Sequence, residues 1–183
     1  MERRNAWLSY TEAEEKELEQ VAKAYRNFLN VGKTERECVT QIIREARAAG
    51  YESLEEKTAK GEKLKAGDKV YTVGMKKIIA LFHIGQDDIS EGMNILGAHI
   101  DSPRLDVKQN PLYEDTDLAY LDTHYYGGVK KYQWVTLPLA IHGVVVKKDG
   151  STAEVNIGED EDDPIVYITC LLYTSPSPRD MRR

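Results

Sequence analysis

The sequence predicts an α/β fold in which two helices come before a sheet. Two segments near the N-terminus show the hydrophobic spacing of amphipathic helices, and each begins with a capping-box pair. A continuous apolar run follows at residues 78–82, and a run without polar alternation is typical of a strand covered on both faces. We therefore expect helices that pack on a sheet.

The first helix is expected to begin after Thr11, which forms a capping-box pair with Glu14. The pattern ends at Asn30 and Gly32, residues that commonly stop a helix. Between these limits the apolar residues recur at helical spacing, and they are Leu18, Val21, Ala22, Tyr25, Phe28 and Leu29.

The second helix is expected to begin after Thr34, paired with Glu37, and to end at Gly50. Its apolar face contains Val39, Ile42, Ile43 and Ala46. Cys38 lies on the same face, where a small buried apolar residue is a better interpretation than a nucleophile. Residues 52–66 are charged and poorly patterned, which favours a solvated connector.

Strand patterns begin at residue 69. The first covers 69–73, and after a turn at Gly74 the second covers 77–84 and contains the apolar run. His83 ends that run, where a structural histidine is a better interpretation than a metal ligand. A third strand is expected at 93–98, directly before His99.

His99 and Asp101 form a candidate metal-binding pattern. Zinc binds neutral imidazole nitrogen, and the other ring nitrogen is usually oriented by a carboxylate. Residues two apart in an extended chain lie on the same side, so Asp101 can reach the ring of His99. Pro103 then ends the strand. An isolated His-x-Asp pattern is weak, and a structural histidine held by a nearby carboxylate is the alternative.

The longer motif around this pair narrows the interpretation. The segment GAHIDSPRLD at 97–106, continued by Val107-Lys108, resembles the first metal-binding motif of the M18 family of aminopeptidases. Residues 125–128 (YYGG), 131–134 (KYQW) and 163–165 (DPI) extend the resemblance over nearly all of residues 1–169. The resemblance implies a cytoplasmic zinc metallopeptidase with two zinc ions per subunit, which assembles from dimers into large tetrahedral oligomers, possible dodecamers, and takes peptides as substrates.

The resemblance also implies roles for the two motif residues. His99 would be a zinc ligand, and Asp101 would be the catalytic-site carboxylate that orients it. The family's remaining ligands and its glutamate base have no match in this chain. Two metal ions need further ligands and a base that activates the bridging water. The full-length product is therefore expected to remove N-terminal residues from peptides, and this chain is expected to be a truncated, inactive fragment.

One departure from the family concerns substrate preference. Members that prefer acidic N-terminal residues carry a Trp-His-x-Trp segment, whose histidine reaches a neighbouring subunit. Tyr132 stands at that histidine's position here, and it is the candidate substrate-binding residue. A tyrosine can donate a hydrogen bond but carries no positive charge near neutral pH. Aspartyl preference is in doubt, and a neutral or broader specificity is equally consistent with the sequence.

The resemblance divides the chain into three parts. Residues 1–106 are expected to begin the catalytic α/β domain, and 107–169 to form part of an inserted β-rich dimerisation domain. Within the second part, 122–128 is expected to be a loop and 134–146 a strand region, with a hairpin turn at 147–150 before a strand at 151–157. His142 is expected to be structural, whereas His124 has a chance of approaching a substrate pocket. Residues 158–163 are expected to be an acidic loop.

Residues 170–183 are expected to be a non-native tail. Cys170 to Asp180 reads CLLYTSPSPRD, which matches, codon for codon, a translation of the transposase adapter used to prepare sequencing libraries. A natural Pro/Ser-rich tail is the alternative. The tail carries a net charge of +2, so the formal charge of −6 becomes −8 without it.

Composition excludes several classes of function. An acidic chain lacks the electrostatic footprint for nucleic acid or an anionic membrane surface. Without the tail only Cys38 remains, so a disulfide framework and a Cys-x-x-Cys site are excluded. We found no membrane-span pattern and no signal-peptide core, so a cytoplasmic location is expected.

Two other interpretations compete with the enzyme. The chain could be a non-catalytic assembly or interaction module related to the family. This interpretation would be favoured if the undisturbed gene also ended near Thr169. It could instead be an unstable fragment whose uncovered sheet edge promotes aggregation.

Overall fold

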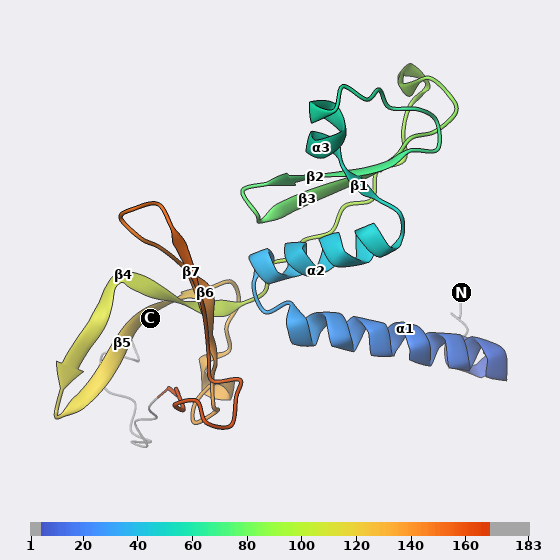
Figure 1. Cartoon of the computed structure of the whole chain (residues 1–183). Helices are drawn as coiled ribbons and strands as arrows, with labels where there is room; N and C mark the ends of the chain where they lie inside the picture. Colours follow the sequence, from blue (N-terminus) through green and yellow to red (C-terminus); the bar gives the residue numbers. More distant parts are fainter. Residues whose placement is uncertain (1–4, 169–183) are drawn as a thin grey trace. The chain divides into compact units, whose positions relative to one another are not determined.

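A computed structural model of the chain describes residues 5–168, and its contacts divide the chain into two compact units, Met1–Asp101 and Ser102–Arg183. All the described α-helices belong to the first unit, and the described part of the second unit consists of hairpins, loops and a short 3-10 helix (Figure 1). The fold class is the predicted mixture of helix and sheet. The proposed non-native tail lies outside the described residues.

Helix α1 (Glu12–Val31) begins at the predicted capping box. Thr11 accepts a hydrogen bond from the backbone of Glu14, and the Glu14 carboxylate accepts one from the backbone of Thr11 at 2.8 Å. A short 3-10 helix, η1 (Ala6–Leu8), precedes it. No residue of α1 is buried among the described residues, and Val21 and Tyr25 are more than half exposed. The helix is amphipathic as predicted, but its apolar face is only partly covered, since Leu18, Ala22 and Phe28 are half-buried and the rest are exposed.

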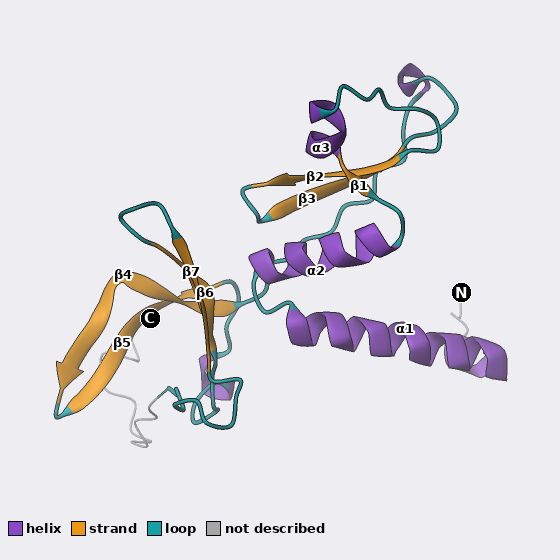
Figure 2. Ribbon diagram, in the orientation of Figure 1, coloured by secondary structure: helices purple, strands orange, loops and turns teal. Residues whose placement is uncertain are grey.

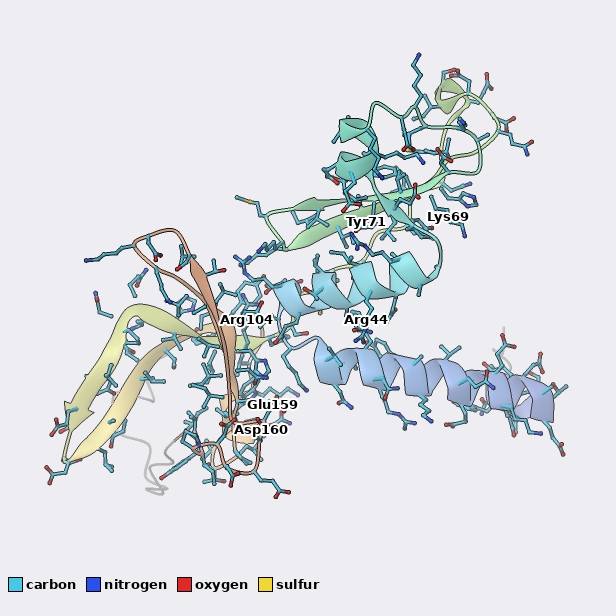
Figure 3. All side chains as sticks on the ribbon, in the orientation of Figure 1. Arg44, Lys69, Tyr71, Arg104, Glu159 and Asp160 are labelled. Carbon is cyan, nitrogen blue, oxygen red and sulfur yellow. The ribbon has the colours of Figure 1, made fainter. Side chains whose placement is uncertain are left out.

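Helix α2 (Glu35–Ala48) forms one side of the core. It begins at the predicted Thr34 cap and buries Cys38, Val39, Gln41 and Ala46. On the sheet side, Val70 and Tyr71 are buried. Arg47 donates a hydrogen bond to the Tyr71 hydroxyl at 2.8 Å, and Figure 3 shows Tyr71 between the sheet and α2.

The sheet of the first unit has the order β1-β2-β3 (Figure 2). Strand β1 (Glu52–Ser53) pairs in parallel with β2 (Lys69–Gly74), and β2 pairs antiparallel with β3 (Ile78–His83). The predicted strands at 69–73 and 77–84 are therefore confirmed. The coverage expected for β3 on both faces is not found within residues 5–168, where Ile78 is 67% exposed and Phe82 44% exposed.

The prediction of a solvated connector at 52–66 is wrong for its first half, which holds β1 and helix α3 (Leu54–Ala59). Ser53 caps α3 by accepting a hydrogen bond from the backbone of Glu56. The charged residues, which hid the helical pattern in the sequence, form ion pairs with one another. Lys57 Nζ lies within 4 Å of three carboxylates, those of Glu52, Glu62 and Asp68.

The strand predicted at 93–98 is also wrong. After the 3-10 helix η2 (Ile89–Glu91), residues 92–103 carry no helix or strand, and the side chain of Leu96 is fully exposed. A strand requires a hydrogen-bonded neighbour, and no described strand pairs with this segment. Regular secondary structure resumes only at Arg104, where β4 begins, so His99 does not lie at the end of a strand.

Strands β4 (Arg104–Asp115) and β5 (Leu118–Tyr126) form an antiparallel hairpin in the second unit. The register shifts between Val107 and Leu112, which indicates a bulge. The loop predicted at 122–128 is wrong, since β5 continues to Tyr126. Both faces of this ribbon are largely exposed, so Asp122, which pairs with Lys108, does not interrupt the strand.

The chain continues through the 3-10 helix η3 (Lys131–Gln133) to a second hairpin of β6 (Ile141–Val146) and β7 (Thr152–Ile157). Its turn lies at the predicted 147–150, where Gly150 has a φ of 83°. Residues 158–163 form a loop as expected. Figure 3 labels Glu159 in this loop, whose carboxylate lies 3.0 Å from His142 Nε2.

Candidate metal-binding segment

The predicted metal-binding pair lies at the end of the first unit, in the segment without regular structure. His99 is highly exposed, with 86% of its side chain accessible, whereas Asp101 is 37% exposed. Ile100, between them, is partly buried. The histidine ring is therefore open to a ligand arriving from solvent.

The structure brings these two side chains together. Nδ1 of His99 lies 3.1 Å from Oδ1 of Asp101 and 3.0 Å from the Asp101 carbonyl oxygen. Both oxygen atoms are acceptors, so this geometry favours the tautomer in which Nδ1 carries the proton. The lone pair of the neutral ring is then on Nε2, which points away from Asp101.

This donor set suits one corner of a zinc site. Zinc is bound by neutral imidazole nitrogen, and a ligating histidine almost always donates its second N–H to a carboxylate or carbonyl oxygen. His99 meets both conditions. Within residues 5–168, however, no group of three or more histidine, cysteine, aspartate or glutamate side chains is placed to hold a metal ion.

The residues that follow the pair fix the start of the second unit. Arg104, labelled in Figure 3, donates from Nε to Asp106 at 2.7 Å, and its guanidinium lies 4.2 Å from the centre of the Tyr126 ring. Gly127 has a φ of 74°, and a Cβ atom there would lie 3.5 Å from Pro103. Gly127 of the YYGG segment therefore packs against Pro103, near the start of the SPRLD segment.

The sequence interpretation missed this arrangement of Arg104 and Tyr126. The sequence did contain a signal for this contact, because one motif segment has a cationic residue and the other an aromatic residue. The two residues face each other across the β4–β5 hairpin. Recognising it requires the register of β4 against β5.

Tyr132, the candidate substrate-binding residue, lies in η3 of the second unit and is 75% exposed. Its hydroxyl is open to solvent. The structure thus brings together His99 and Asp101, while Tyr132 belongs to the other unit.

No helix in the described part of the chain is long and apolar enough to cross a membrane. This finding covers residues 5–168.

Comparison with known proteins identifies the family. Residues 28–174 match the model of the aminopeptidase I zinc metalloprotease family, M18, which covers more than half of the chain and includes His99 and Asp101. The chain belongs to the M18 family. The match extends past Thr169, so residues 170–174 resemble both the family and the adapter translation.

Similar M18 proteins support the same assignment. The chain is 56% identical over 171 residues to a probable M18 family aminopeptidase 1 from Clostridium acetobutylicum, covering 93% of this chain and 37% of that protein. It also resembles the crystal structure of aminopeptidase I from Borrelia burgdorferi B31, with a TM-score of 0.85, 39% identity, and coverage of 93% of this chain and 41% of that one.

A third match is the crystal structure of an M18 family aminopeptidase from Thermotoga maritima. The TM-score is 0.84 at 42% identity, and the match covers 94% of this chain and 37% of that chain. The M18 chain described here therefore spans about two fifths of the length of these relatives or less.

Proposed function

We propose that the protein to which this chain belongs is a zinc-dependent aminopeptidase that removes N-terminal residues from peptides. The observation that carries the proposal is the M18 family match across residues 28–174, which contains the oriented His99 and Asp101 pair. Relatives named as M18 aminopeptidases over the same region support it.

In this proposal His99 is a metal ligand through Nε2. Asp101 accepts a hydrogen bond from Nδ1–H and so keeps the ring in the tautomer and direction that ligation requires. A bound zinc ion would supply Lewis-acid polarisation of the scissile carbonyl and acidify a bound water. Asp101 acts through His99, and its contribution is to the position and basicity of that ligand.

We also propose that this chain alone does not hydrolyse peptides. Hydrolysis at a site with two metal ions requires ligands for both and a base that removes a proton from water. The motif supplies His99 and Asp101, and within residues 5–168 no group of three or more potential metal ligands is present. The family's other ligands and base would come from the part of the relatives' length that this chain does not span.

Three further features stay as proposals that rest on the resemblance: two zinc ions per subunit, assembly of dimers into larger oligomers, and a cytoplasmic location. For specificity we propose a neutral or broad preference, with Tyr132 contributing a hydroxyl where acid-preferring members carry a histidine. Its exposed position in η3 is compatible with that contact.

The test compares the 183-residue chain with the product of the uninterrupted gene. Both are purified and assayed with leucyl and aspartyl chromogenic substrates in the presence of added zinc. We expect activity from the longer protein only, with the leucyl substrate cleaved at least as well as the aspartyl one. Activity from the short chain would contradict the second proposal.

A matched variant tests the role of the metal ligand. His99→Ala in the longer protein is expected to abolish activity, whereas His83→Ala should leave it unchanged, because His83 lies at the end of β3 outside the motif. Full activity of the His99→Ala protein would rule out the proposed ligand.

A further inference from the structure

Helix α2 contacts the segment that carries His99 and Asp101, and the contact is made by Cys38. The Cys38 residue is 5% exposed, and its Sγ lies 3.8 Å from the carbonyl oxygen of Ile100 and 3.6 Å from that of Gly32. Ile100 is the residue between His99 and Asp101. The buried thiol therefore contacts the backbone between the two residues of the pair.

Gly32 makes this close packing possible. A Cβ atom at Gly32 would lie 2.8 Å from Cys38 Sγ and 3.2 Å from the carbonyl oxygen of Phe28. Any larger residue would have to displace the sulfur or the end of α1. With glycine there, the thiol can contact the carbonyl oxygens of both Gly32 and Ile100.

The thiol keeps its proton in this position. Burial raises the pKa of Cys38 above its ordinary value, and the nearby carboxylates of Glu37 and Glu35 raise it further. A protonated thiol is a weak donor, which the two carbonyl oxygens can share. Such a contact adds little to stability, because the S–H group is a weak donor.

Exposure along the segment follows from that contact. Side chains in an extended segment alternate between its two sides. Ile100, whose carbonyl contacts Cys38, is partly buried, while the His99 side chain is 86% exposed and that of Asp101 37% exposed. Holding Ile100 against the helix turns both functional side chains outward together.

We propose that Cys38 is a positioning residue for the metal-binding pair, because it holds the Ile100 carbonyl against α2 and fixes the direction in which His99 and Asp101 face. This inference rests on the proposed role of His99 as a zinc ligand. Cys38 does not touch the metal or the substrate.

The test uses the isotope-labelled 183-residue chain, with zinc alone as the ligand, and NMR to follow the resonances of residues 99–101. Cys38→Ala is expected to weaken zinc binding at His99 by about tenfold, the loss typical of a group that orients a metal ligand. It should also accelerate amide exchange at Ile100 and Asp101 by about tenfold or more relative to the rest of the first unit.

Val39→Ala is the matched control. Val39 lies next to Cys38 in α2 and is 2% exposed, so its truncation removes core packing without removing the sulfur. It should lower stability while leaving zinc affinity and the relative exchange of Ile100 unchanged. Equal effects of the two substitutions, or no local effect of Cys38→Ala, would overturn the inference.

The outcomes separate this inference from the metal proposal. The ligand proposal fails if zinc causes no change in the wild-type spectrum, or if the change persists in His99→Ala. The exchange rates of Ile100 and Asp101 measured without zinc still test the positioning role in that case. Gly32→Ala provides a second variant, because its Cβ atom would lie 2.8 Å from the sulfur and displace it. It should reproduce the local increase in exchange, and unchanged exchange would count against the inference.

Discussion

Asp101 presents two oxygen atoms to the same nitrogen of His99, its carboxylate at 3.1 Å and its own carbonyl at 3.0 Å. The carbonyl belongs to the backbone and survives any substitution. The carboxylate alone adds negative charge, which raises the basicity of the ring as a ligand. The two contributions can therefore be separated by changing the side chain.

Asp101→Ala is expected to weaken zinc binding at His99 by about tenfold in the 183-residue chain, because the ring loses its charged acceptor. Nitrogen chemical shifts of the ring should show a larger population of the tautomer protonated at Nε2. Asp106→Ala is the control, since Asp106 pairs with Arg104 in the other unit. An equal loss of affinity in both variants would contradict the role given to Asp101.

The β2–β3 turn contains two residues in the left-handed region, Met75 with a φ of 52° and Lys76 with a φ of 58°. A residue with a Cβ atom is strained there, whereas glycine is not. Lys76→Gly is therefore expected to raise the free energy of unfolding of the first unit by about 1 kcal/mol. Denaturant unfolding provides the measurement.

Lys77→Gly is the control for this prediction. Lys77 follows in the same turn, and its φ is not positive. Glycine there only increases the freedom of the unfolded chain, so no stabilisation is expected. A stabilising effect of Lys77→Gly as large as that of Lys76→Gly would argue against strain at Lys76.

At the scale of elements, the two helix starts use the same capping box in different surroundings. Thr11 begins the exposed α1, and Thr34 begins α2, which forms part of the core. The Glu14 carboxylate accepts hydrogen bonds from the backbone and side chain of Thr11, and these bonds hold the pKa of Glu14 below its ordinary value. The start of α1 is therefore linked to pH.

The sign of that linkage follows from the lowered pKa. A carboxyl group with a depressed pKa in the folded state stabilises that state above its unfolded pKa, and the contribution is lost as pH falls through the folded value. We expect the first turn of α1 to fray below about pH 4. Backbone chemical shifts of residues 11–15 measure this change.

Glu14→Gln is the matched control, because glutamine keeps an acceptor for the cap but does not titrate. Its first turn should show no comparable change between neutral and acidic pH. If the variant frays over the same range as wild type, another group is responsible for the pH dependence.

The sequence predicted those elements whose signals are local. Both capping boxes, the 69–73 and 77–84 strands and the 147–150 turn depend on neighbouring residues, and all are present. The segment at 93–98 looked equally apolar but forms no strand, because strand formation requires a partner that local sequence does not specify. Strands of the β4–β5 hairpin were missed because exposed ribbons need no alternation of apolar and polar residues.

The same distinction applies to the candidate site. His99 and Asp101 are two residues apart, so chain geometry alone predicted their contact. The contact between Cys38 and Ile100 joins residues 62 positions apart and could not be predicted from spacing. Cys38 was correctly expected to be buried, but its neighbour could be found only in the structure.

For the whole molecule, the decisive feature is the uneven distribution of buried side chains. All the buried residues within 5–168 belong to the first unit, where Val39 and Val70 are almost completely inaccessible. The described part of the second unit consists of two-stranded hairpins, which are marginally stable in water without further packing. The two units should therefore differ in stability.

We expect amide hydrogen exchange to be slow in β2 and fast in β6 and β7 of the 183-residue chain. Val70→Ala should destabilise the first unit by about 2 kcal/mol, because it leaves a cavity beside β2 in the core of that unit. Exchange should then accelerate in β2 and stay unchanged in β7, since local unfolding reports the stability of each cooperative region. Val145→Ala, at a position in β6 that is 53% exposed, is the control and should leave β2 unaffected. Slow exchange in β7 that responds to Val70→Ala would show instead that the two units unfold as one.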